Sequence, residues 1–167
     1  DDVGQIELEV IADDGNGGVI SSSFRLTVNN TNDAPVLNNP LADTSVDQGT
    51  LFNFVVPAST FSDIDNDILR LTATLNGGGE LPAWLNFDAA TGTFSGTPGN
   101  DDVGDVVVSI TAGDGNGETV VDEFVITVNN VNDQPQVENV LSNAAVNEDA
   151  VFSYIVPTNT FSDGDND

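Results

Sequence analysis

The sequence predicts an all-β protein, organised as tandem repeats of about 100 residues that each fold into a seven-stranded sandwich. Three observations support this prediction. Apolar and polar residues alternate in several short runs, and no stretch has a helical period. The chain matches itself at a fixed offset, and turn sequences rich in glycine and aspartate separate the runs.

The repeat is evident when the chain is compared with itself at an offset of 100 residues. About 30 of the 67 overlapping pairs are identical, far more than chance would give, and the match needs no gap. Among the matches, residues 1–4 correspond to 101–104, 32–35 to 132–135 and 61–67 to 161–167. The chain therefore contains parts of at least three copies of one structural unit.

The recurring Asn-Asp-x-Pro segment marks the edge of each repeat, because proline ends a strand and stiffens a turn. Residues 1–33 are then the C-terminal part of one repeat, 34–133 a complete repeat, and 134–167 the N-terminal part of a third. The outer pieces lack sheet partners unless flanking chain or another molecule supplies them. The chain has no methionine and no leader sequence, so we expect it to begin inside a longer protein.

The strands of the complete repeat follow from the pattern in order. Residues 36–46 and 51–56 come first, and the alternating run from Leu69 to Leu75 predicts a half-buried strand over 68–75. Strands over 81–87 and 93–97 flank the turn at Thr91-Gly92, with Trp84 expected in the core rather than as a ligand platform. Alternating runs over 105–112 and 119–129 flank the turn of residues 113–118.

Seven antiparallel strands in about 100 residues predict an immunoglobulin-like sandwich. The chain direction reverses at each connection, so the loops alternate between the two ends of the sandwich. The entering linker 30–35 and the loops 57–67 and 113–118 share one end. The loops 47–50 and 98–104 and the exit linker 130–135 share the other.

The charge of the chain excludes several functions. The net charge is −26, with 28 acidic residues against Arg25 and Arg70. Such a chain repels phosphate backbones and anionic membranes, so nucleic acid and lipid surfaces are excluded as partners. The alternating apolar runs argue against a disordered acidic tail. There is no cysteine, so no disulfide can stabilise the fold, and a bound metal ion is one remaining means of stabilising a small secreted domain.

The acidic and amide residues gather where consecutive repeats meet. Unscreened carboxylates so close together would repel strongly, and Ca²⁺, which takes six to eight oxygen ligands, resolves this. An Asp-x-Asp-x-Asp loop in extended form would also point three carboxylates the same way. The candidate ligands at the first junction are Asp1, Asp2, Asn30, Asn32, Asp33, Asp63, Asp65, Asp67 and Asp114. Those at the second are Asp47, Asp101, Asp102, Asn130, Asn132, Asp133, Asp163, Asp165 and Asp167.

Other interpretations of these acidic loops carry less weight. An EF-hand starting at Asp63 would need glycine at its sixth position and glutamate at its twelfth, where the chain has Ile68 and Thr74. Alone, the Asp63 loop is more often a solvated loop and Asp114-Gly115 more often a hairpin turn. Their convergence with the Asn-Asp linker at one end of the sandwich favours calcium.

The repeat resembles the dystroglycan-type cadherin-like repeats of large bacterial adhesins. The resemblance spans the whole chain and rests on the motifs Phe-Ser-Asp-x-Asp-x-Asp at 61–67, Leu-Pro-x-Trp-Leu at 81–85, the Phe87–Pro98 segment, Asp-Val-Gly at 102–104 and Asn-Asp-x-Pro at 132–135. It implies that Asn32-Asp33 is a linker motif and that Asp63, Asp65 and Asp114 are calcium ligands. Asp88 is expected to cap a turn. Glu148 matches a family glutamate that Gln48 lacks, which makes the neighbouring Asp47 a weaker candidate.

Taken together, the sequence predicts a calcium-rigidified spacer of an extracellular, cell-surface or secreted adhesin, which projects a binding tip and contacts adjacent repeats of its own chain. Two alternatives remain open: a filament or sheath subunit completed by strands of neighbouring copies, and a calcium-dependent carbohydrate-binding module. The chain has no histidine and no lysine, and its carboxylates crowd at domain ends rather than in a cleft, so we do not expect an enzyme.

Overall fold

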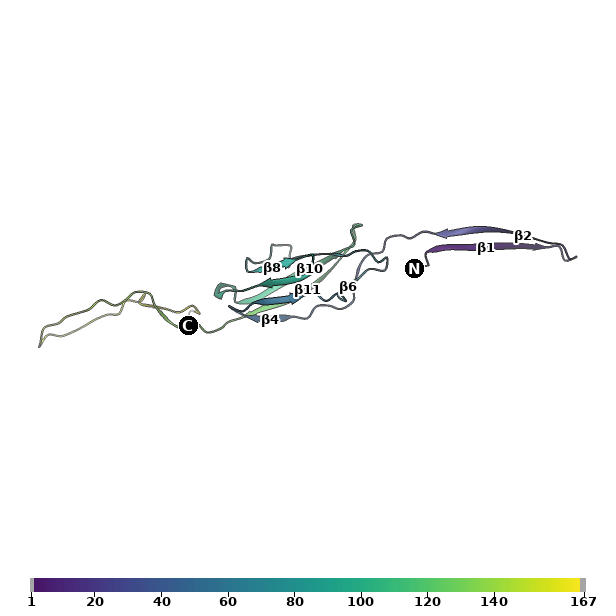
Figure 1. Ribbon diagram of the computed structural model, residues 1–167. Coiled ribbons are helices and arrows are strands. Elements are labelled where there is room, and N and C mark those ends of the chain that lie inside the picture. Colours follow the sequence, from purple (N-terminus) through teal and green to yellow (C-terminus); the bar gives the residue numbers. More distant parts are fainter. Residues whose placement is uncertain (1, 166–167) are drawn as a thin grey trace.

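The protein is elongated, with a central sandwich between two thin arms (Figure 1). The structure, a computed structural model, describes residues 2–165. The N-terminal arm is a hairpin of β1 (Gly4–Asp13) and β2 (Val19–Val28). The C-terminal arm contains the short strands β12 (Gln136–Val137) and β13 (Phe161–Ser162), which pair with each other. The predicted ligands Asp1 and Asp167 lie outside the described residues.

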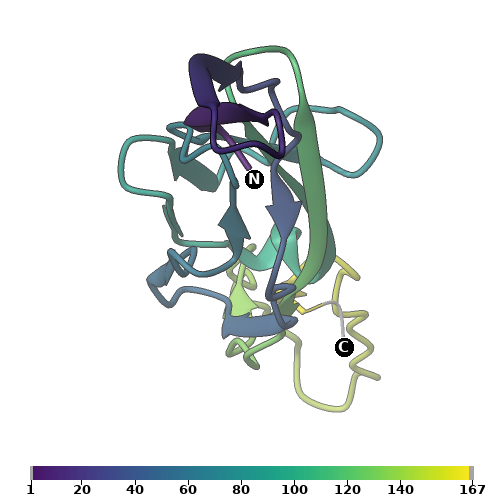
Figure 2. The same cartoon turned by 90° about the vertical axis from the view of Figure 1, so that its right-hand side faces the viewer.

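The central sandwich spans the repeat predicted as complete. Its elements are β3 (Val36–Leu37), β4 (Thr44–Asp47), β5 (Phe52–Val55), β6 (Phe61–Ser62), β7 (Arg70–Leu75), β8 (Leu85–Asp88), β9 (Thr93–Gly96), the short 3-10 helix η1 (Asn100–Asp102), β10 (Gly104–Gly113) and β11 (Thr119–Asn129). One sheet has the order β4-β11-β10-β7, and the other sheet has the order β5-β9-β8. Figure 2 views the protein along its long axis. The all-β sandwich predicted from the sequence is confirmed.

The first predicted strand, 36–46, is wrong as a single antiparallel element. β3 pairs antiparallel with β6, whereas β4 pairs parallel with β11 in the other sheet. Pro40 lies between them and has no N–H to donate to a ladder, so the strand is interrupted there and changes sheets. Side chains satisfy the backbone at the crossing: Asp122 accepts from the Leu41 N–H at 2.7 Å, and Asp43 accepts from the Val125 N–H at 2.8 Å.

The predicted strand 81–87 begins later than expected. Residues 82–85 form a turn, in which the Leu85 N–H donates to the Pro82 carbonyl at 2.9 Å, and β8 starts at Leu85. Proline favours a turn over a ladder position here as well. Asp88 then accepts from the Ala90 N–H and the Thr91 hydroxyl, both at 2.9 Å, which confirms its predicted role in the β8–β9 turn.

An aromatic cluster fills the space between the two sheets. The rings of Phe94 and Phe124 are fully buried, 5.6 Å apart and edge to face, and Phe54 lies 5.5 Å from Phe124. Trp84 packs edge-on against Phe52 at 6.2 Å and lies against the core. The prediction that Trp84 is a core residue is confirmed, and the burial of these rings contributes to the repeat's stability.

Gly96 is required where β9 passes the turn before β8. A Cβ at this position would overlap the backbone carbonyl of Trp84, which cannot move without displacing the strand. We expect Gly96→Ala to lower the free energy of unfolding by about 1–3 kcal/mol, as overpacking does. Urea denaturation followed by Trp84 fluorescence measures this. Gly99→Ala is the control, because its new Cβ would lie 3.6 Å from Asp102, an ordinary contact; equal losses in both variants would contradict the prediction.

Within residues 2–165, no helix is long and apolar enough to cross a membrane.

Candidate metal centre at the repeat junction

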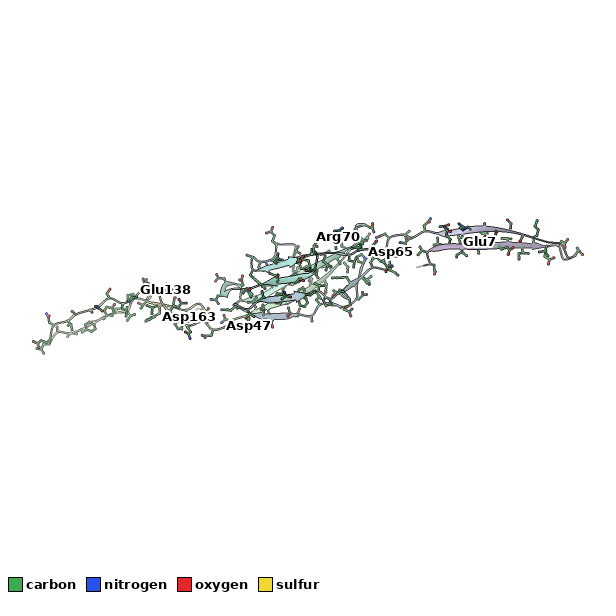
Figure 3. The ribbon with its side chains drawn as sticks, viewed as in Figure 1. Glu7, Asp47, Asp65, Arg70, Glu138 and Asp163 are labelled. Atoms are coloured by element: carbon green, nitrogen blue, oxygen red, sulfur yellow. The ribbon has the colours of Figure 1, made fainter. Side chains whose placement is uncertain are left out.

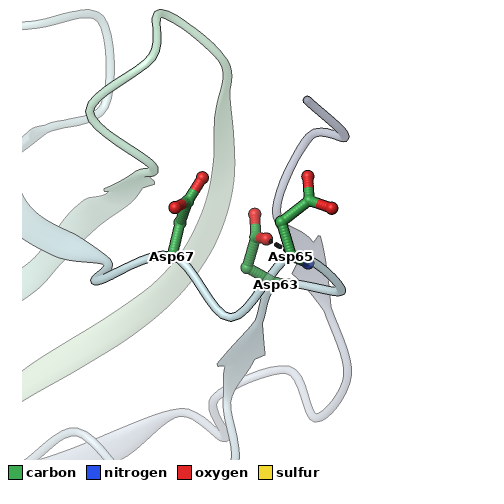
Figure 4. Close-up of side chains that lie close together, drawn as sticks. All are labelled: Asp63, Asp65 and Asp67. Carbon is green, nitrogen blue, oxygen red and sulfur yellow. Dashed lines mark hydrogen bonds between the residues drawn. The ribbon is translucent and has the colours of Figure 1, made fainter. Parts of the chain in front are cut away.

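The first junction is built around the loop that carries Asp63, Asp65 and Asp67. One carboxylate oxygen of each lies within 4.8 Å of the others (Figure 4). The predicted extended loop is wrong. The segment forms a turn in which the Asn66 N–H donates to the Asp63 carbonyl at 3.3 Å, and Asn66 takes a left-handed φ of 62°. Asp63 also accepts from the Asp65 N–H at 2.8 Å, and this turn, rather than strand alternation, gathers the carboxylates.

The entering linker is bonded to this loop. Asn30 donates through Nδ2 to Asp65 Oδ1 at 2.8 Å, and the Asp33 N–H donates to Asp65 Oδ2 at 2.7 Å. Asp65 lies at the end of the sandwich that faces the N-terminal hairpin (Figure 3). Both oxygens of one carboxylate therefore hold the linker against the repeat that follows it.

The turn between β10 and β11 completes the junction. Asn32 donates through Nδ2 to Asp114 Oδ2 at 2.8 Å, and Asn116 donates to both Asn32 Oδ1 and Asp67 Oδ2 at 2.7 Å. Sequence reasoning missed Asn116. The repeated Asp-Gly-Asn-Gly turn, at 14–17 and again at 114–117, was the available signal. Asn116 joins the third carboxylate of the cluster to the linker.

Hydrogen bonds favour the ionised form of two of these carboxylates. The backbone N–H of Asp33, together with the Asn30 amide, lowers the pKa of Asp65. The Asn32 amide lowers the pKa of the buried Asp114, and the backbone N–H groups that follow Asp114 lower it further. Asp63 Oδ2 is buried and has no hydrogen-bond partner. A group of ionised carboxylates with one unpartnered oxygen suits a hard cation such as Ca²⁺.

The second junction repeats two of the hydrogen bonds of the first. The Asp133 N–H donates to Asp165 Oδ2 at 2.6 Å, and the Asp165 N–H donates to Asp163 Oδ1 at 2.9 Å. Asp165 Oδ1 is buried without a partner, as Asp63 Oδ2 is at the first junction. Asn100 donates to the Gly164 carbonyl. The loop 98–104, the exit linker and the next acidic loop thus meet at one end of the sandwich, as strand parity predicted.

The remaining predicted ligands are exposed or have other hydrogen-bond partners. Asp2, Asp101 and Asn130 are exposed, and Asn132 donates to the Asp133 carbonyl within the linker. Asp102 accepts from the Gly99 N–H at 2.8 Å and caps η1, and Asp47 accepts from Asn129 at 2.9 Å. Figure 3 places Asp47 and Asp163 at the same end of the sandwich. The described geometry is therefore most complete for Asp63, Asp65, Asp67, Asp114 and the linker 30–33.

Acid should destabilise the first junction. The pKa values of Asp65 and Asp114 are lower in the folded protein than in the unfolded chain, where aspartate has a pKa of about 3.9. Their ionised forms therefore stabilise the fold above that pH, and the stabilisation is lost as the pH falls through their folded-state pKa values. We expect the thermal midpoint in EGTA to fall from about pH 5 downward. Circular dichroism between neutral pH and strong acid measures it. Asp114→Asn should flatten the dependence; an unchanged slope would contradict the assignment.

Two packed sheets with this strand order define an immunoglobulin-like, cadherin-like β-sandwich domain. The family described as Putative Ig domain matches residues 34–129, which is more than half of the chain. The chain belongs to this family of immunoglobulin-like domains. A comparison with curated protein sequences finds no match.

Solved structures resemble the chain in fold. The first two domains of human mucin-like protocadherin align with a TM-score of 0.56 at 16% identity, covering 76% of this chain and 69% of that one. The endo-fucoidan hydrolase MfFcnA4 of glycoside hydrolase family 107 aligns with a TM-score of 0.50 at 24% identity. That match covers 78% of this chain but 19% of the hydrolase, so the chain spans about a fifth of its length. These likenesses concern the fold alone.

Proposed function

We propose that this protein is a calcium-rigidified spacer of a large bacterial surface or secreted adhesin. Its repeats lie end to end, and calcium at each junction stiffens the array so that a distant tip is held away from the cell. In this proposal residues 1–33 and 134–167 are parts of the repeats before and after the complete one at 34–133. The direct partners are the adjacent repeats of the same chain.

One observation carries the proposal: the linker is hydrogen-bonded to the carboxylates that cluster at the tip of the following repeat. Asp65 accepts from both Asn30 and the Asp33 backbone, at 2.8 and 2.7 Å. A cation bound by Asp63, Asp65 and Asp67 would neutralise charge at the point where linker and domain meet. Binding only to the ordered junction would stabilise that arrangement.

The residues present fit calcium better than other metals. The cluster offers carboxylate, amide and backbone oxygens, and the chain has no cysteine or histidine. Asp63, Asp65, Asp67 and Asp114 would supply carboxylates, and Asn32 would supply an amide oxygen after its side chain turns. The bound ion would supply charge neutralisation and cross-linking, with no chemical step.

Small-angle X-ray scattering tests the spacer function. We expect calcium to increase the maximum dimension of the monomeric chain relative to EGTA, because a stiff linker keeps the N-terminal hairpin in line with the sandwich. Magnesium should have a smaller effect, because it demands octahedral geometry and retains its waters. Identical scattering with calcium and EGTA would contradict a calcium-dependent rod.

The carbohydrate-binding alternative gains little support from the site. Such a module needs an exposed aromatic platform on the folded domain, and in the central repeat Trp84 packs against Phe52 and the core.

A further inference from the structure

The turn between β10 and β11 places an asparagine directly before a glycine. Asn116 and Gly117 are both exposed, and Gly117 has a φ of 115°. A Cβ at Gly117 would meet nothing within 4 Å, so the surroundings of this residue are open to water. Because glycine has no side chain, its backbone nitrogen can approach the carbonyl carbon of the preceding asparagine side chain with little hindrance.

The Asn116 amide joins two parts of the first junction. Its Nδ2 donates to Asn32 Oδ1 in the linker and to Asp67 Oδ2 in the acidic loop, both at 2.7 Å. We call the amide and its two acceptors the Asn116 latch. It closes the junction with hydrogen bonds alone, through two oxygens that the calcium site proposed above would also use.

We propose that Asn116 is a site of deamidation, and that the product makes the closed junction depend on a cation. The Gly117 backbone nitrogen attacks Asn116 Cγ, and the new N–Cγ bond forms as the Cγ–Nδ2 bond breaks. The proton of the Gly117 N–H leaves with Nδ2 as ammonia. Water then opens the cyclic imide, at Cγ to give aspartate or at the backbone carbonyl to give isoaspartate. Nothing is oxidised or reduced, and water is the only co-reactant.

Either product removes the donor on which the latch depends. An ionised carboxylate only accepts hydrogen bonds, and the two groups around it, Asn32 Oδ1 and Asp67 Oδ2, are also acceptors. Two carboxylates then face each other where an amide and a carboxylate were bonded, and they repel. A cation between them would restore the attraction and gain a further oxygen ligand, a consequence that rests on the calcium-binding function proposed above.

The N-terminal hairpin contains the same turn sequence and provides an internal comparison. Asn16 and Gly17 are exposed, and Asn16 Nδ2 donates to the Asp14 carbonyl at 3.1 Å within the turn. This one local bond restrains the Asn16 amide less than the two 2.7 Å bonds restrain that of Asn116. We therefore expect Asn16 to deamidate first and Asn116 more slowly.

Peptide mapping by mass spectrometry, on the 167-residue chain kept at mildly alkaline pH in EGTA, tests the modification. Both aspartate and isoaspartate should appear at Asn16 and, later, at Asn116. Asn32→Ala removes one acceptor of the latch and should speed the conversion of Asn116 but not that of Asn16. Asn139 precedes a valine and should stay unchanged. If Asn116 stays intact in both chains while Asn16 converts, the modification site is rejected.

Asn116→Asp reproduces the aspartate product and tests the latch. In EGTA it should lower the thermal midpoint, followed by Trp84 fluorescence, by on the order of 5 °C, because the bonds of the latch are lost and like charges meet. Asn86→Asp is the control, since it adds the same charge at an exposed position of β8 in the same repeat. It should leave the midpoint close to that of the wild type. Equal midpoints in the two variants would overturn the latch.

Isothermal titration with calcium separates this inference from the proposed function. Asn116→Asp should bind calcium roughly tenfold more tightly than the wild type, because it loses a competing donor and gains a carboxylate. Asn86→Asp should bind like the wild type. Equal affinities in all three chains would overturn the cation dependence of the deamidated junction. A lowered midpoint in EGTA without calcium binding by any chain would reject the metal site and the cation dependence, and leave the latch standing.

Discussion

We expect calcium to raise the thermal midpoint of the chain, and Asp63→Asn/Asp65→Asn/Asp67→Asn to remove the increase. At a calcium concentration of 100 times the dissociation constant, one site adds about 2.7 kcal/mol to the free energy of unfolding. For a domain of this size that corresponds to a shift on the order of 10 °C. The substitutions keep the size of each side chain but remove the three clustered carboxylates, which would be the strongest ligands for calcium. Differential scanning calorimetry with calcium and with EGTA measures the shift.

The control for this prediction must change the net charge equally. Glu7→Gln/Glu9→Gln/Glu80→Gln also removes three negative charges, at positions away from the cluster, and should keep the full calcium shift. If both triple variants lose the shift equally, calcium acts only by screening the charge of −26. A wild type without any shift would reject the metal site, and the aspartates would then be a solvated, hydrogen-bonded surface.

The sequence predicted the sandwich well because its strongest signals are local. The alternation that ends in Phe124, Ile126 and Val128 places these residues on one face of β11, and all three are buried. The exact internal repeat also placed the linkers. Strand parity then predicted that Asp63, Asp114 and the linker 30–33 share one end of the domain, where the structure brings them together.

The missed features depend on geometry that a strand pattern does not encode. β3 and β6 have two residues each, and their pairing is set by where the chain crosses between the sheets at Pro40. Asn116 was missed because the Gly-Asn-Gly sequence predicts only a turn. The folded chain is what brings the Asn116 amide to both Asn32 and Asp67. The clustering of the aspartates was predicted correctly for the wrong reason, since a turn at Asn66 produces it.

The repeat also supplies a matched pair for testing how much its core contributes. We expect Phe124→Ala to lower the free energy of unfolding of the central repeat by about 3–5 kcal/mol, because a buried ring is lost and a cavity remains. Phe124 is 1% exposed and contacts both Phe54 and Phe94. Urea denaturation followed by Trp84 fluorescence, at a concentration where the chain is monomeric, measures the change.

Phe24→Ala is the matched control, because Phe24 occupies the corresponding position of β2 and is 54% exposed. The substitution removes the same atoms from the equivalent strand position, but no second sheet covers Phe24. The urea midpoint followed by Trp84 fluorescence should therefore change little. Comparing the two variants separates the effect of burial on stability from the effect of residue type. Equal losses in the two variants would mean that the hairpin already packs against the central repeat. No loss at Phe124 would mean that the aromatic cluster is not the core, and the assignment of stability to it would fail.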